Sequence, residues 1–383
     1  MKNKTKNDKL DPKFKHFMLQ EIYAQPQAAM EAVTHYLSPE NQEKAIAGIA
    51  LDEKHLRELE RVVILASGTS RHAGMVGEFM IERLARLPVD VDFASQYCYR
   101  DPLAEPNGLA VLLSQSGTTA DTLLALYEAK AKGARTIAIC NVEDAPLARE
   151  ADGVLYTHAG KEIAVAATKS FTAQLTALFA LGVHLGHTRR TLTTHETREH
   201  LDSLMQLPEK IEAALGCGEL THKCAVSMKD ATSFLFLGRD ISYPIALEGA
   251  LKLKETSYIH AEGMPTGEMK HGPNAMVDER MPVVMLLTRN AMDAGSNLRW
   301  EKSMVLLEQV AARGVHVNAV ACMEDAEAVA KHAAMVFAVP SAPALLLPVL
   351  EIIPLQLLAY HIAVLRGVNV DKPRNLSKSV TVE

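Results

Sequence analysis

Two halves of this sequence repeat each other, and this duplication constrains the fold more than any other feature. Residues 233–240 parallel residues 62–70, and in both segments a short apolar run ends in polar residues. Gly133 followed by Glu143-Asp144-Ala145 returns, with the same internal spacing, as Gly314 followed by Glu324-Asp325-Ala326. A period this long is typical of a duplicated domain rather than of a repeat array. A length of 383 residues likewise favours two domains.

Each half alternates short apolar runs with segments of helical periodicity. The runs expected to be strands are residues 61–66, 89–93, 109–113, 136–140 and 153–156 in the first half, and they lie within 233–240 and 282–288 in the second. Strands separated by helices form parallel sheets with helices on both faces. We therefore predict an α/β fold of two tandem, doubly wound domains.

Three segments outside this alternation are also expected to contain helices. Residues 17–22 begin an amphipathic helix that Pro26 interrupts or restarts, and residues 187–220 indicate a linker plus a helix. Residues 342–365 are the most hydrophobic segment, but they contain Pro348, Glu351, Pro354, Gln356 and His361. This composition predicts a core helix and not a membrane span.

A dense group of hydroxyl side chains follows the strand expected at residues 109–113. Ser114, Ser116, Thr118 and Thr119 stand with Gln115 and Gly117 directly before a helical pattern. The free N–H groups of a helix N-terminus attract anions, and hydroxyls add donors. Without Lys or Arg in the loop, the expected ligand is a phosphate monoester. The alternative is an ordinary capped helix, but four hydroxyls exceed what capping requires.

The second copy has Thr288-Arg289-Asn290 in the corresponding place. One ligand per chain is therefore expected rather than two. The charge of the chain also bears on its binding partners. The net charge is −6, and no basic block follows the N-terminal tail. We expect no nucleic-acid partner.

Five cysteines show neither CxxC spacing nor a disulfide framework, and Cys140 and Cys322 lie in apolar runs. This pattern favours buried thiols in a reducing, cytoplasmic location. Residues 1–16 are charged and lack the apolar segment of a signal peptide. No membrane association is expected.

Ionisable residues gather in three stretches of the second half. Glu248, Lys252 and Glu255 share one face of the helix expected at 246–259, a spacing that alone favours a surface salt-bridge face. The loop 260–273 adds carboxylates and His271, groups suited to proton transfer beside a carbonyl and at a ring oxygen. The C-terminal lysines, Lys372 and Lys378, belong either to a frayed tail or, if desolvated, to an imine-forming nucleophile.

Together these motifs resemble the sugar isomerase (SIS) domains, in particular the isomerase half of the glutamine–fructose-6-phosphate aminotransferases. The resemblance covers residues 17–383. Its motifs are Ser-Gln-Ser-Gly-x-Thr at 114–119, Ala-Thr-Lys-Ser-Phe-Thr at 167–172, Ala-Leu-Glu-Gly-Ala-Leu-Lys-Leu-Lys-Glu at 246–255, Gly-Glu-Met-Lys-His-Gly-Pro at 267–273, and the end of the chain from Asp371.

The resemblance implies two tandem SIS domains and an ordered C-terminal tail. The expected divisions are a tail and helix at 1–45, the first SIS domain at 46–190, a linker helix at 191–222, the second SIS domain at 223–367 and the tail at 368–383. It also implies a homodimer, in which the loop bearing His271 faces the partner subunit's Glu255 and Lys378.

Carried over position by position, the resemblance implies which residues hold and transform a sugar phosphate. The phosphate would be held by Ser114, Gln115, Ser116 and Thr119, with Ser70 close by and Val165 lining the sugar. Glu255 would move the proton between C1 and C2, and Lys252 would stabilise the developing charge. His271 would open the sugar ring, and Lys378 would hold the open-chain ketose as an imine. No metal or other cofactor is expected.

Three departures from the family pattern bear on the substrate. No glutaminase domain with its N-terminal Cys nucleophile is present in this sequence. Ala167 stands where the family usually has a serine that touches the sugar, and Thr118 replaces an acidic residue, while residues 263–266 differ from the synthase loop. The expected activity is an isomerase and deaminase that interconverts glucosamine 6-phosphate with fructose 6-phosphate and ammonia.

Four alternatives stay open at this point. Two are enzymes with other substrates, a fructosamine-6-phosphate deglycase and a galactosamine-6-phosphate isomerase/deaminase. A third is the isomerase subunit of a glutamine–fructose-6-phosphate aminotransferase. The last is a non-catalytic sugar-phosphate-binding regulator, in which Glu255, His271 and Lys378 would be superfluous.

Overall fold

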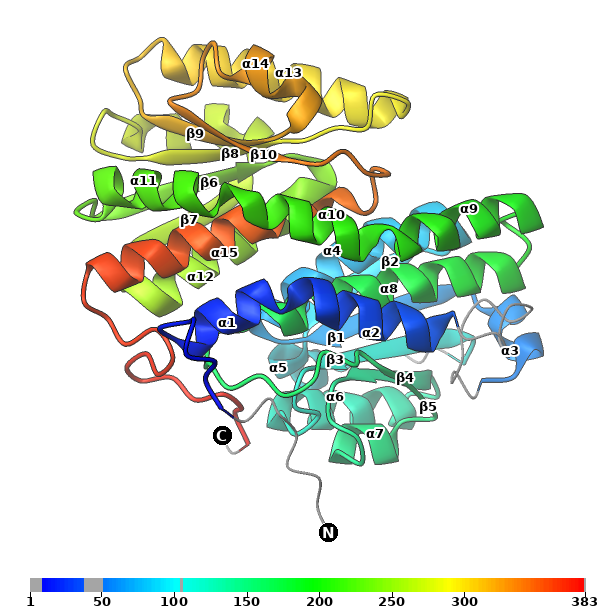
Figure 1. Cartoon of the computed structure of the whole chain (residues 1–383). Helices are drawn as coiled ribbons and strands as arrows, with labels where there is room; N and C mark the ends of the chain where they lie inside the picture. The colour runs from blue at the N-terminus through cyan, green and yellow to red at the C-terminus, as the bar shows by residue number, and fades with distance from the viewer. Residues whose placement is uncertain (1–8, 38–50, 104–105, 382–383) are drawn as a thin grey trace. The chain divides into compact units, whose positions relative to one another are not determined.

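The computed structural model describes residues 9–37, 51–103 and 106–381 (Figure 1). The described residues form two compact units. The N-terminal unit comprises the described residues within 25–162, 169–208 and 377–383. The C-terminal unit comprises those within 1–24, 163–168 and 209–376.

The described part of the N-terminal unit contains a five-stranded parallel sheet in the order β2-β1-β3-β4-β5. Figure 1 shows α2, α4 and α8 on one face of this sheet and α5, α6 and α7 on the other. The elements are α2 (Gln25–Tyr36), α3 (Glu53–Glu58), β1 (Arg61–Ala66), α4 (Gly68–Ala85), β2 (Val89–Phe93), α5 (Ala94–Tyr97), η3 (Cys98–Arg100), β3 (Gly108–Ser114), α6 (Ala120–Ala131), β4 (Arg135–Cys140), α7 (Pro146–Glu150), β5 (Gly153–Tyr156), α8 (Lys169–Thr188) and α9 (Thr194–Met205).

The described part of the C-terminal unit has a second parallel sheet of five strands, in the order β10-β9-β8-β6-β7. Helices α11, α12 and α15 cover one face and α13 and α14 the other (Figure 1). The elements are α1 (Phe17–Tyr23), α10 (Leu207–Ala214), η4 (Leu215–Cys217), α11 (Gly218–Met228), β6 (Ser233–Gly238), η5 (Asp240–Ser242), α12 (Tyr243–Ser257), β7 (His260–Pro265), η6 (Thr266–His271), η7 (Pro273–Met276), β8 (Val283–Leu287), α13 (Ala294–Ala311), β9 (Val317–Cys322), η8 (Met323–Asp325), α14 (Ala326–Val329), β10 (Met335–Val339) and α15 (Leu347–Leu365).

The two sheets have the same topology, which confirms the predicted duplication and the doubly wound α/β class. In each sheet the first strand of the unit lies between the second and the third, so the winding direction reverses there. Ligands of such folds bind beyond the carboxyl ends of the strands at this reversal. In the N-terminal unit this point lies between β1 and β3, where Ala66 pairs with Leu113.

The central strands of the N-terminal unit are buried because helices cover both faces of the sheet (Figure 1). Every residue of β3 is buried, as are the last five of β1, and this explains their continuous apolar runs. Helix α8 is buried along almost its whole length, from Lys169 to Gly186. Leu178 on α8 fills the space above Gly77 of α4, where a Cβ atom would approach its Cδ2 atom to 2.8 Å. These two helices therefore pack at close range.

Two of the predicted segments have a more detailed structure than expected. Pro26 restarts the chain as a new helix, since it lies in the first turn of α2. Residues 187–220 contain more helix than predicted, because α9, α10 and part of α11 follow each other with short turns. At the start of α9, Thr193 and Glu196 form a capping box. The prediction rested on the charge and threonine content of this segment and did not consider that motif.

The apolar segment near the C-terminus forms α15, which packs against α11 and α12. Among the described residues it is the one helix long and apolar enough to cross a bilayer, and 89% of its most apolar window is buried inside the protein. This burial agrees with the predicted core helix. Beyond α15, Asp371 accepts hydrogen bonds from the backbone N–H groups of Phe17 and Met18, at 3.0 and 2.8 Å. The tail is thus tied to α1, as predicted for an ordered tail.

Candidate functional site

The residues singled out from the sequence fall into two groups, one in each unit. The N-terminal unit holds Ser70, the loop 114–119 and Lys378. The C-terminal unit holds Val165, Lys252, Glu255 and His271. Each group has its own local geometry.

The loop 114–119 lies at the carboxyl end of β3, directly before α6. Ser114 is 4% exposed, whereas Gln115, Ser116, Thr118 and Thr119 are half-buried. Two backbone hydrogen bonds connect the loop to neighbouring segments. Asn141 N–H donates to the Gln115 carbonyl at 3.1 Å, and Leu147 N–H donates to the Gly117 carbonyl at 3.0 Å. The strand end and the start of α7 therefore hold it in place.

The hydroxyls of this loop bond to one another and to loop N–H groups. The Ser114 and Thr119 hydroxyls are 2.9 Å apart, and Ser114 Oγ accepts from Gly117 N–H at 3.1 Å. Ser116 Oγ accepts from the N–H and the hydroxyl of Thr118, at 3.2 and 2.9 Å. Thr119 is the N-cap residue of α6, yet its side chain makes no capping hydrogen bond. Simple capping, the alternative interpretation, does not account for these hydroxyls.

Gly117 gives the loop its shape. Its φ is +64°, and a Cβ atom there would lie 2.5 Å from the Cβ of Ala145. Glycine avoids both the left-handed strain and the collision. The turn can therefore fold back tightly beside β4 and α7.

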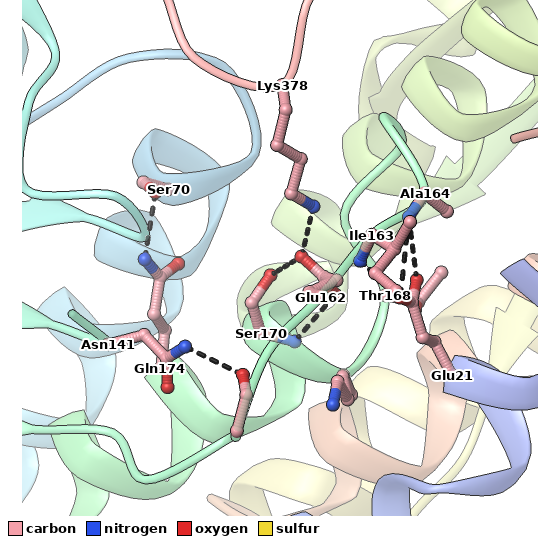
Figure 2. A network of polar contacts seen from close by, with 12 residues as sticks. Glu21, Ser70, Asn141, Glu162, Ile163, Ala164, Thr168, Ser170, Gln174 and Lys378 are labelled. Carbon is pink, nitrogen blue, oxygen red and sulfur yellow. Dashed lines mark hydrogen bonds and ion pairs between the residues drawn. The ribbon is translucent and has the colours of Figure 1, made fainter. Parts of the chain in front are cut away.

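A second polar surface follows β1, the neighbouring strand. Ser70, in the first turn of α4, accepts a hydrogen bond from Gln174 Nε2 of α8 at 2.9 Å (Figure 2). Ser67 Oγ and Gln174 Oε1 are two of the buried polar atoms that have no hydrogen-bond partner among the described residues. Buried polar atoms normally have partners, so these two atoms favour a polar ligand or ordered water at this point.

The end of the chain joins the same unit. The Val380 carbonyl accepts a hydrogen bond from Ala120 N–H at 3.1 Å, immediately after the hydroxyl loop. Lys378 points at Glu162 and forms an ion pair with its carboxylate (Figure 2). Glu162 also accepts from the Ser170 N–H at 3.1 Å and from the Ser170 hydroxyl at 2.7 Å. The lysine is therefore anchored and is not part of a frayed tail.

In the C-terminal unit, α12 carries a buried row of charges. Lys252 Nζ lies 2.5 Å from Glu255 Oε2 and 3.4 Å from Glu248 Oε1. The side chains of Lys252 and Glu248 are fully buried, and that of Glu255 is 21% exposed. Burial by itself lowers the pKa of Lys252, but the two carboxylates outweigh it and raise that pKa. This burial excludes the surface salt-bridge face, and Glu255 is the member that solvent reaches.

His271 and Val165 occupy the remaining predicted positions of this unit. His271 is exposed at the end of η6, just before Gly272, whose φ is +132°. Val165 is half-buried in the segment 163–168, and its N–H donates to the Asp371 carbonyl at 3.0 Å. Glu21 of α1 accepts from the N–H groups of residues 163 and 164 in the same segment (Figure 2).

In the C-terminal unit, a buried carboxyl group lies near the carboxyl ends of β6 and β8. Glu351 of α15 is fully buried and accepts hydrogen bonds from the hydroxyls of Ser242, at 2.8 Å, and Thr288. Burial raises the pKa of Glu351, and the two hydroxyl hydrogen bonds and Arg299 act against that effect. The carboxyl of Glu351 therefore occupies both of these hydroxyls.

Sequence reasoning missed Glu162 and Gln174. Each is a polar residue at a buried position, in or beside the apolar helix α8. The only local signal was the presence of Glu and Gln in a segment otherwise suited to the core. In the part of the chain that the structure describes, no group of three or more His, Cys, Asp or Glu side chains could hold a metal ion.

Comparison with known proteins gives matches over nearly the whole chain. The family model described as SIS domain matches residues 55–184 and 227–366. A glutamine–fructose-6-phosphate aminotransferase (isomerizing) of Chlorobaculum tepidum is 46% identical over 370 residues, which are 97% of this chain and 59% of that protein. The chain thus spans about three fifths of the length of the curated relatives it matches.

Two solved structures are similar along their full length. The C-terminal domain of glucosamine-fructose-6-phosphate aminotransferase from Francisella tularensis has a TM-score of 0.88 and 36% identity, and the match covers 95% of this chain and 100% of that one. A glucosamine-6-phosphate deaminase from Thermotoga maritima has a TM-score of 0.73 and 26% identity, and the match covers 95% of this chain and 99% of that one.

Proposed function

The chain belongs to the SIS domain family, and on that premise we propose that it is an amino-sugar-phosphate isomerase and deaminase. The proposed reaction interconverts glucosamine 6-phosphate and water with fructose 6-phosphate and ammonia. The observation that carries the proposal is the hydroxyl loop at the winding reversal, with an anchored lysine in the same unit.

The loop suits a phosphate monoester. Its hydroxyls can turn outward as donors, and they lie at the N-terminus of α6, where the helix dipole favours an anion. Ser114, Ser116 and Thr119 are the proposed contacts, with Gln115 and Ser70 at its border. In Ser114→Ala and Ser116→Ala each lost hydrogen bond to the charged group costs about 1.5–3 kcal/mol. KM for the sugar phosphate should rise accordingly. An unchanged KM in both variants would indicate that the phosphate binds at another place.

The chemical steps need a base, an acid and an amine. Glu255 is the proposed base for the proton shift between C1 and C2, because it is the carboxylate of the α12 row that solvent reaches. Lys252 carries a positive charge beside it, which stabilises negative charge developing on the substrate. His271 is the proposed acid for ring opening, and Lys378 the proposed amine that holds the ketose as an imine. Val165 is the proposed wall of the sugar site.

The isomerase part of a glutamine-dependent aminotransferase is the second candidate, because the relatives in that class reach 46% identity. The deaminase is favoured by the Thermotoga maritima structure, 99% of which the chain matches. A deglycase, a galactosamine-6-phosphate enzyme and a regulator have no comparable support.

The test is to incubate purified protein with glucosamine 6-phosphate and measure ammonia and fructose 6-phosphate. Galactosamine 6-phosphate and phosphorylated fructosamines complete the panel, with and without glutamine and EDTA. We expect ammonia release without glutamine and in the presence of EDTA. Activity that depends on glutamine would favour the second candidate, and amine release from fructosamine phosphate alone would favour the deglycase.

A further inference from the structure

Glu162 is the least expected group in the N-terminal unit. Its side chain has no exposed surface, whereas the side chain of its partner Lys378 is 25% exposed. An isolated carboxylate in such a place costs several kcal/mol, so its charge must be compensated. Residues 162 and 378 are 216 positions apart, and the fold brings them into direct contact (Figure 2).

The surroundings of Glu162 favour its ionised form. Ser170 N–H lies in the first turn of α8, and it donates to Oε1 at 3.1 Å. The Ser170 hydroxyl donates to Oε2 at 2.7 Å, the same oxygen that Lys378 contacts. The positive end of a buried helix of twenty residues adds to this effect. Glu162 is thus held from one side by α8 and presents one oxygen to the lysine.

An amine in an ion pair cannot attack a carbonyl, because its lone pair holds a proton. We infer that Glu162 is the positioning residue of Lys378 and the acceptor of its ammonium proton during imine formation. The inference rests on the proposed function, which makes Lys378 the nucleophile.

The proton balance closes within the pair. Glu162 takes one proton from the Lys378 ammonium, and the neutral amine attacks C2 of the open-chain ketose. A proton passes from the new C–N nitrogen to the former carbonyl oxygen, which gives a carbinolamine. Glu162 then returns its proton to the hydroxyl, water leaves, and the iminium forms beside a carboxylate. The net change is ammonium plus ketone giving iminium plus water.

A solely structural role for Glu162 would have different consequences. If the carboxylate served only to hold the tail and α8 in place, slower trapping in Glu162→Gln would come with weaker binding of fructose 6-phosphate or with lower thermal stability. Ser170→Ala is the matched control, because it removes a hydrogen bond to Glu162 and leaves the Lys378 ion pair. Glu162→Gln keeps the size and the contact with α8 but cannot accept the proton.

The experiment is borohydride trapping of fructose 6-phosphate, with the rate of adduct formation followed on the peptide that contains Lys378. Binding of fructose 6-phosphate and thermal unfolding are measured on the same variants. We expect Glu162→Gln to slow trapping by about 10²–10⁴-fold, as for loss of a positioned acid or base, with binding unchanged. Ser170→Ala should trap at close to the wild-type rate, and Glu162→Asp should be intermediate.

Three results overturn the inference: trapping in Glu162→Gln at the wild-type rate, equal slowing in Ser170→Ala, and no adduct on Lys378 in the wild type. If Glu162→Gln does not fold, Glu162→Asp decides, since it moves the carboxylate away from Lys378 and must slow trapping without weakening binding. Ammonia release from glucosamine 6-phosphate by the wild type judges the proposed function separately, because trapping needs only the ketose phosphate.

Discussion

Gly117 provides a quantitative test of the hydroxyl loop. In Gly117→Ala the new residue must adopt a φ of +64°, which costs an L-residue about 1–2 kcal/mol. Its Cβ would also lie 2.5 Å from Ala145 Cβ, and overpacking of this kind costs about 1–3 kcal/mol. The variant should therefore lose about 2–5 kcal/mol of stability. Displacement of the loop hydroxyls should raise KM for the sugar phosphate as well.

The same unit supplies a matched control. Gly133 has a φ of +87°, but among the described residues a Cβ there would have one neighbour within 4 Å, Pro106 Cα at 3.9 Å. Gly133→Ala should thus show the backbone cost alone, about 1–2 kcal/mol. Urea denaturation measures both variants, and Ala145→Gly in the Gly117→Ala background should recover the packing part relative to Ala145→Gly alone. Equal destabilisation of Gly117→Ala and Gly133→Ala, or no recovery in the double variant, would show that the contact with Ala145 does not contribute to the cost.

Three further predictions concern ionisable side chains. Glu255→Gln should keep substrate binding but lower turnover by about 10²–10⁴-fold, measured as exchange of the C1–C2 proton with solvent; turnover near the wild-type rate would remove Glu255 as the base. The pKa values of His158 and His361 are lowered to about 4, first by burial and then by His35 and His222, so the folded state binds fewer protons than the unfolded chain below about pH 6.5. Stability should fall as the pH drops from about 6.5 towards 4, and less steeply when both histidines are replaced by Phe; identical pH curves would contradict this assignment. In the homodimer that the family resemblance implies, mixing His271→Ala with Glu255→Gln chains should restore roughly a quarter of the activity after subunit exchange, and no recovery would show that His271 serves its own chain.

The fold could be predicted because its signals are local. A strand buried on both faces needs a continuous apolar run, so 61–66 and 109–113 could be recognised without any knowledge of their neighbours. The hydroxyl loop was visible for the same reason, since a strand, a turn and a helix start follow each other within a few residues. The capping box at Thr193 was equally local but was hidden in a charged segment.

Burial and pairing, in contrast, depend on what the chain packs against. The spacing of Glu248, Lys252 and Glu255 fits an exposed or a buried face equally well, and only the packing of α12 against β7 and α15 decides that the row is buried. Glu162 and Lys378 carry no mark of their contact in the sequence, because 216 positions separate them. The sequence alone determined where the polar loop lies along the chain, through local hydrophobic patterns. Tertiary structure decided which buried charges face each other, because the free energy of a buried charge depends on its neighbours in space.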